Sequence, residues 1–185
     1  IDLTNLNPSL FPIASAALDV AYKSLLQEKD LVLDNSKLVH KYLLNPKENK
    51  DAVDEMNSNE ELINKIDASL TKFLTDIKTE TLTDEDNKLQ IIYLEINKNL
   101  ERIGDMAINI LEMSNMIKED KGSFTKDAEN ELNAMFNNLY KMLDSTFKYV
   151  DSKSLDEYGE LVIQEDEMDS LEEQARSNHF TRMAN

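Results

Sequence analysis

The chain has 185 residues, of which 41% are hydrophobic, and it contains three glycines, three prolines and no cysteine. This length can bury one substantial core, and the shortage of turn-forming residues indicates a single helical domain. The 37 acidic and 20 basic residues give a formal net charge of −17, which repels phosphate backbones and anionic lipid surfaces. We therefore expect cations as partners, no nucleic acid and no direct lipid binding. The lack of cysteine excludes disulfides, thiolate metal sites and cysteine nucleophiles.

The spacing of apolar residues predicts five helices, and the capping and helix-breaking residues between them are typical of an all-α bundle. The first spans residues 9–44, with Pro12 in its opening turn. It ends at Asn45 and Pro46, because a residue before proline avoids the helical conformation. The polar segment 47–58 that follows is predicted to be a loop.

Capping residues mark the second and third helices. Ser58 and Glu61 form a capping box, and the apolar stripe that follows predicts a second helix over residues 58–77. The third helix is predicted over residues 83–118, beginning at a threonine. Gly122 is expected to stop it.

The last two helices are predicted in the same way. The fourth spans residues 125–150. Ser154 and Glu157 make a second capping box, from which the fifth helix runs until it fades near Asn185.

The third helix carries two acidic residues around a glycine. Glu101 and Asp105 are four residues apart, so their carboxylates lie on one ridge and repel each other by a few tenths of a kcal/mol. Gly104 costs roughly 1 kcal/mol more than alanine. Either the strip is solvated and screened by Arg102 and nearby lysines, or the carboxylates meet at a cation while the glycine lets another group approach the backbone. The pattern alone favours the solvated strip, since charge runs on acidic helices are usually surface, and it leaves the cation site open.

Hard-cation binding agrees with these residues better than catalysis does. Carboxylate and amide oxygens suit magnesium, calcium, manganese or iron. An oxidative di-iron enzyme would use Glu-x-x-His pairs, whereas His40 follows Lys37 and His179 follows Arg176 at that spacing. A carboxylate-metal hydrolase or oxidase that uses this strip is the competing class.

Three segments carry a resemblance to a known family. Leu-Glu-Arg-Ile-Gly-Asp at residues 100–105, followed by Ala107, Asn109 and Ile110, resembles the signature of the PhoU family of phosphate-uptake regulators. The opening residues 6–14 are similar to the start of the PhoU-like domain that follows the membrane part of bacterial sodium/phosphate cotransporters. The segment 165–169, with Arg176, His179 and Arg182 after it, resembles the middle helix of the family's second repeat.

The resemblance implies an all-α fold, an antiparallel helical bundle of two PhoU-type three-helix repeats. We expect a single domain over residues 1–185, with the first repeat at residues 1–122 and a partial second repeat at residues 123–185. The chain begins at Ile1 without an initiator methionine, so we expect it to be a fragment of a longer protein.

The resemblance also implies a metal site. In the PhoU family, an acidic residue and an aspartate four positions later carry metal clusters, and Glu101 and Asp105 match that motif. Glu165 and Asp169 offer the same spacing in the second unit. Asp67 matches half of the motif, because Ile63 stands where its partner acid would be. The expected ions are iron, manganese, magnesium, calcium or zinc, with these ligands: Glu101, Asp105, Glu165, Asp169 and Asp67.

The function that follows from the resemblance is regulatory and non-catalytic. We expect a cytoplasmic PhoU-like domain of a sodium-dependent inorganic phosphate cotransporter, on the cytoplasmic side of the cell membrane. Its expected partners are the membrane part of the same chain and a second copy in a homodimer. The alternative within this class is a stand-alone PhoU regulator that acts on a phosphate ABC transporter and its sensor kinase.

Overall fold

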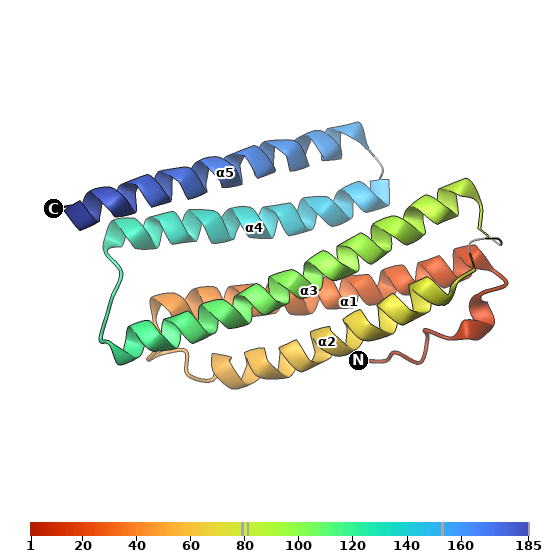
Figure 1. Cartoon of the computed structure of the whole chain (residues 1–185), viewed down its shortest axis with the longest axis horizontal. Helices are drawn as coiled ribbons and strands as arrows, with labels where there is room; N and C mark the ends of the chain where they lie inside the picture. The colour runs from red at the N-terminus through yellow and green to blue at the C-terminus, as the bar shows by residue number, and fades with distance from the viewer. Residues whose placement is uncertain (79, 81, 153, 185) are drawn as a thin grey trace.

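The computed structural model describes residues 1–78, 80, 82–152 and 154–184, and this part of the chain is helical with no strand (Figure 1). The prediction of an all-α fold is therefore confirmed. No described helix has the length and apolar content needed to cross a bilayer. The elements in chain order are the 3₁₀ turn η1 (Pro8–Leu10), α1 (Ala14–Leu44), α2 (Ala52–Asp76), α3 (Asp84–Glu119), α4 (Lys126–Ser152) and α5 (Leu155–Ala184).

The predicted start of α3 at Thr83 is confirmed, and so is the predicted start of α4 near residue 125. The backbone N–H of Asp86 donates to Thr83 Oγ1 at 3.1 Å, and that of Ala128 donates to Thr125 Oγ1 at 3.2 Å. Each bond satisfies one of the amide groups that a helix start leaves without a partner. The expected end of α5 near Asn185 lies outside the described residues.

The helix α2 begins at Ala52, so the predicted loop over 47–58 and the predicted start at Ser58 are wrong. Ala52 and Met56 are buried in an apolar cluster, which extends the helix by more than a turn towards its N-terminus. Asp54 and Glu55 lie in the new first turn, where acidic side chains interact favourably with the helix dipole. Tertiary burial therefore outweighs the local capping signal.

The predicted start of α1 at residue 9 is also wrong, because the regular helix begins at Ala14. Residues before it form η1, in which the Asn7 side chain accepts a hydrogen bond from the Ser9 N–H at 2.9 Å. Phe11 packs on the core with its ring centroid 5.2 Å from that of Phe73. The opening segment is thus an integral part of the packed structure.

Gly122 follows the end of α3 as predicted, but the left-handed residue there is Lys121, with φ of 56°. The N–H of Gly122 bonds to the Ile117 carbonyl at 2.8 Å, and the N–H of Lys121 bonds to the Lys118 carbonyl at 3.1 Å. This pair of bonds is a Schellman motif, which closes the last turn of the helix.

The helices α1, α2 and α3 pack against one another as an antiparallel three-helix bundle (Figure 1). The hairpin of α4 and α5 lies alongside, with α4 in contact with α1. The expected division between residues 122 and 123 falls in the connection between α3 and α4.

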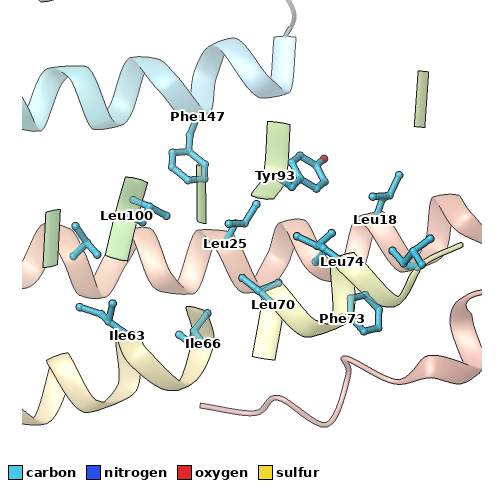
Figure 2. Close-up of a cluster of buried hydrophobic side chains, with 14 of the residues drawn as sticks. Leu18, Leu25, Ile63, Ile66, Leu70, Phe73, Leu74, Tyr93, Leu100 and Phe147 are labelled. Atoms are coloured by element: carbon cyan, nitrogen blue, oxygen red, sulfur yellow. The ribbon is translucent and has the colours of Figure 1, made fainter. Parts of the chain in front are cut away.

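The core of the bundle consists of two apolar clusters. The larger one, which Figure 2 shows, gathers residues such as Leu25, Leu70 and Leu100 from the three bundle helices, and Leu143 and Phe147 from α4. The second lies at the other end of the bundle and includes Val39, Met56 and Leu111. Along the helices, Glu28 and Asp67 fall within the span of the larger cluster, whereas Glu60 falls between Met56 of the second cluster and Ile63 of the larger one.

Candidate functional site

Polar residues interrupt the core positions of all three bundle helices. In α1, Glu28 and Asn35 follow Leu25 and Val32 at the three-residue steps of an apolar heptad, and both are fully buried. The same happens in α3 at the fully buried Asn97, and partly buried acidic residues flank the core positions of α2. The polar residues on the inner faces or edges of these helices are Glu28, Asn35, Glu60, Asp67, Asn97, Glu101 and Asp105.

The helix α3 places Glu101 and Asp105 at this level of the bundle, with the buried Gly104 between them. A Cβ atom added to Gly104 would lie 3.2 Å from Glu60 Oε2 and 3.4 Å from Ile63 Cδ1, both on α2. The glycine therefore lets a carboxylate and a core side chain approach the backbone of α3 closely. The structure shows the close approach at Gly104, and the cation at this motif stays a prediction.

Asp67 on α2 lies across from Asn97 and Lys98 on α3. The Asn97 amide nitrogen donates to Asp67 Oδ1 at 2.9 Å, to the Asp67 carbonyl at 3.2 Å and to Thr71 Oγ1 at 3.0 Å. Lys98 Nζ lies 2.9 Å from Glu101 Oε2 and 3.9 Å from Asp67 Oδ2. The structure thus brings together Asp67 and Glu101, two of the predicted ligands, around one ammonium group.

Glu28 on α1 faces the same group of charges from the inside of the bundle. Its side chain is 0% exposed, and within the described structure neither carboxyl oxygen has a hydrogen-bond partner. Burial raises the pKa of Glu28 to about 9, and the negative charges of Asp67 and Glu101 add to this effect while Lys98 opposes it. A buried polar group without a partner costs about 1–3 kcal/mol. This residue destabilises the fold unless something binds to it.

Glu60 on α2 forms a second acidic pair with Asp105. Burial raises the pKa of Glu60 well above its usual range, and the nearby Asp105 carboxylate raises it further. Glu60 Oε2 is also a buried oxygen with no hydrogen-bond partner among the described residues. The buried Glu60 carboxyl group and the adjacent Asp105 carboxylate form a pair that a cation would neutralise.

The second predicted pair lies elsewhere. Glu165 and Asp169 are exposed on α5, whose main packing partner is α4. The structure does not bring them near Asp67, Glu101 or Asp105 in the three-helix bundle. Any site at Glu165 and Asp169 stays a prediction.

Glu28 and Glu60 were not predicted as site residues from the sequence. Glu28 occupies a position of the α1 heptad that apolar residues fill one turn before and one turn after, at Leu25 and Val32. Glu60 precedes Asp67 by seven residues, so the two side chains share one face of α2. A charged residue at a core heptad position was the signal available for Glu28, whereas Glu60 lies beside the core stripe of α2 and carried no such signal.

The residues fit a hard cation by two criteria, although among the described residues no group of three acidic, histidine or cysteine side chains is already arranged to hold one. The donor set consists of carboxylate and amide oxygens, which magnesium, manganese and calcium prefer. Buried oxygens without hydrogen-bond partners also gather here, on Glu28, Glu60 and Asn97. Asp67, Glu101 and Asp105 are the side chains that would hold the ion at the bundle surface.

These observations define a class of protein: a helical bundle that has a cluster of carboxylates between its first three helices. A family model described as the PhoU domain matches residues 13–114, which is more than half of the chain. The match contains α1, α2, most of α3 and the whole acidic site. The chain therefore belongs to the PhoU domain family. No curated protein and no solved structure gave a significant match.

Membership of this family indicates a regulatory role in phosphate transport, and PhoU domains are in general non-catalytic. The helices α4 and α5 lie outside the matched residues.

Proposed function

We propose that this chain is the cytoplasmic regulatory domain of a sodium-dependent inorganic phosphate cotransporter, and that it controls transport through contact with the membrane part of the same protein. The PhoU match over α1 to α3, including the acidic site, is the observation that carries the regulatory part of this proposal. The packed opening segment supports the cotransporter part. Its residues 6–14, which resemble the start of such domains, dock on the core through Leu10 and Phe11.

The acidic site would link the domain to cations. Glu101 and Asp105 come from α3, and Asp67 comes from α2, so an ion held by these carboxylates would connect two helices of the bundle. Ordering of the bundle by an ion would change the surface that the domain presents to its partner. A bound ion would neutralise the negative charge of these carboxylates, and the carboxylates would fix its position.

Phosphate uptake in cells tests this proposal. The full-length gene that encodes this chain would be expressed in a bacterial strain without its own phosphate transporters, and sodium-dependent uptake of labelled phosphate would be measured. We expect the double variant Glu101→Gln/Asp105→Asn to change the uptake rate severalfold. Glu95→Gln/Glu119→Gln, which removes two exposed charges from the same helix, should leave uptake unchanged.

Three outcomes would contradict the proposal. Equal uptake by the site variant and the wild type, at equal protein levels, would remove the link between the acidic site and transport. Uptake that does not depend on sodium, and that appears only when a phosphate ABC transporter is expressed in the same strain, would instead identify a stand-alone regulator. Purified protein supplied with manganese, magnesium or iron should not hydrolyse phosphate esters, and turnover that is lost in Glu101→Gln/Asp105→Asn would favour the enzyme class.

A further inference from the structure

An apolar groove lies between the C-terminal part of α3 and the hairpin of α4 and α5, at the end of the molecule that holds the C-terminus (Figure 1). Its volume is about 380 Å³, and in the described structure its lining side chains are all apolar, among them Ile110, Met113, Met135, Leu139 and Met168. The helix α4 packs on α1 and α5, which leaves its side towards α3 partly exposed. Apolar surface of this kind marks a site of interaction.

A second hollow, of about 530 Å³, continues this groove along α4 and α5. The two hollows share lining residues of α3 and α4, including Ile117 and Leu132. Along α5 their lining extends from Met168 to Met183, a helical stretch roughly 22 Å long. This length equals about four helical turns, so the groove is long enough to hold an α-helix.

Methionines are concentrated in the groove. Four of the eight in the chain line it: Met113, Met135, Met168 and Met183. Met106, which is 61% exposed, lies one turn before Ile110 on the same face of α3 and extends the apolar surface. Methionine side chains are flexible and polarizable, and they are frequent on surfaces that bind apolar faces of other helices. The composition of the groove therefore favours a helical occupant.

The charges beside the groove indicate which kind of helix would bind. Residues 156–175 of α5 contain nine acidic residues and no basic one. Glu165 precedes Met168 by three residues and Glu172 follows it by four, so both acids lie on the same face of α5 as this lining residue. An apolar strip with acidic neighbours is complementary to a helix that has one apolar face and basic side chains along its edges.

A second copy of this chain would be a poorer occupant of the groove. Each copy has a net charge of −17, so the acidic edges of two copies would repel each other. Arg176 and Arg182 of α5 are already paired with Glu172 and Glu131 of the same copy. A basic partner would gain electrostatic attraction at the same surface.

We propose that this groove binds an amphipathic α-helix of a partner protein, with lysine or arginine residues along the edges of its apolar face. The apolar face packs on Met113, Met135 and Met168, and the basic side chains lie near Glu165 and Glu172. The inference goes beyond the proposed function, because it requires neither a bound cation nor a transporter.

Peptide binding to the purified chain tests the inference. The probe is a synthetic 18-residue peptide of leucine, lysine and one tryptophan, in which the leucines form one helical face. The chain contains no tryptophan, so the fluorescence of the peptide reports binding directly. We expect a Kd of about 10 μM or lower at about 0.1 M salt. A control peptide of the same composition, in an order that breaks the apolar face, should bind at least about tenfold more weakly.

Matched variants locate the bound peptide. Met113→Lys/Met168→Lys should weaken binding at least about tenfold, because it removes apolar contacts and adds positive charge. Ile91→Lys/Ile163→Lys changes exposed residues on the same two helices outside the groove and adds the same charge, so it should weaken binding clearly less. Glu165→Gln/Glu172→Gln, which alters exposed side chains only, should weaken binding severalfold.

Several results would overturn the inference. Equal affinity of the two double lysine variants, or equal binding of the two peptides, would show attraction by net charge alone. A dimer in analytical ultracentrifugation that Met113→Lys/Met168→Lys abolishes would identify a second copy as the occupant. Glu101→Gln/Asp105→Asn should bind the peptide as the wild type does, so failure of the groove and failure of the acidic site in the uptake assay are separate results.

Discussion

Gly104 lies in the interior of α3, where glycine costs roughly 1 kcal/mol relative to alanine. Its lack of a side chain allows Glu60 and Ile63 of α2 to approach the α3 backbone. The loss of helix stability at Gly104 therefore accompanies a close contact between α2 and α3 beside the acidic site. Gly159 on α5 offers a comparison. A Cβ atom added there would have no other atom within 4 Å, apart from its chain neighbours and the nearby backbone of its own helix.

Alanine substitutions at the two glycines should differ in their effect. Gly159→Ala should raise the free energy of unfolding by about 1 kcal/mol, because helix propensity improves and nothing is displaced. Gly104→Ala should gain clearly less, because the new methyl group would lie 3.2 Å from Glu60 Oε2 and push that carboxyl group away. Urea denaturation measures both values. Equal stabilisation by the two substitutions would show that close approach at Gly104 is unimportant.

The stability of the metal-free protein should fall as pH rises, and Glu28 should be a principal cause. Its pKa is raised from 4.5 to about 9 by burial and by the facing charges of Asp67 and Glu101, with Lys98 acting in the opposite direction. Between these two values the folded protein binds more protons than the unfolded chain, so the stability present below the lower value is lost towards the upper one.

Melting temperatures in chelator, measured between about pH 5 and about pH 9, test this pH dependence. The curve of Glu28→Met should be flatter than that of the wild type, and the difference isolates Glu28 from the general repulsion of an acidic chain. Parallel curves for the two proteins would contradict the assigned role of Glu28.

The residues of the candidate site could be predicted only in part. Glu101 and Asp105 were predicted as site residues from their spacing and from their resemblance to the PhoU signature. Asp67, on the facing helix α2, was predicted because it matches half of the same motif. Glu28 and Glu60 were not predicted, because one acid among 37 gives no signal by its type alone. Its meaning depends on which face of the helix is buried, and that depends on how the three helices pack.

The helices themselves were predicted more completely than their ends. Long apolar stripes predict α1 to α5, because a helix needs one continuous face to bury. The predicted ranges of α3 and α4 begin at Thr83 and Thr125, whose hydroxyl oxygens accept hydrogen bonds from backbone N–H groups three residues on, so these starts depend on local sequence. The start of α2 was wrong because Ala52 and Met56 become buried only when the second apolar cluster forms.

The element α5 has the weakest attachment to the rest of the described chain. Its main packing partner is α4, and large apolar side chains such as Ile163 and Phe180 are more than 60% exposed. In contrast, α2 contacts both α1 and α3 and buries Ile66 and Leu70 completely. Local opening should therefore require less free energy in α5 than in α2.

Amide hydrogen exchange followed by mass spectrometry tests this difference. Peptides from α5 should exchange at least about tenfold faster than peptides from the centre of α2. Addition of Mn²⁺ should slow exchange in α1, α2 and α3 and leave α5 unchanged, because the acidic site lies in the three-helix bundle. Equal protection of α2 and α5 would contradict this view of the packing.

At the scale of the whole molecule, the family match and the acidic site coincide. The matched residues 13–114 contain the three-helix bundle, and the polar interruption of its core supplies carboxyl groups from all three helices. The resemblance of the segment 165–169 to a second repeat lies outside the match, so the second unit stays a prediction. A net charge of −17 also favours cations over anions as ligands of this chain.

The most direct test of the account is a crystal structure of the purified chain soaked with Mn²⁺, with anomalous scattering used to locate the ion. We predict an anomalous peak between α2 and α3, with carboxylate oxygens of Asp67 and Glu101 within about 2.0–2.6 Å of it. Anomalous peaks confined to the exposed Glu165 and Asp169, or no peak at an ion concentration that saturates binding in solution, would contradict the central claim that the three-helix bundle contains a cation site.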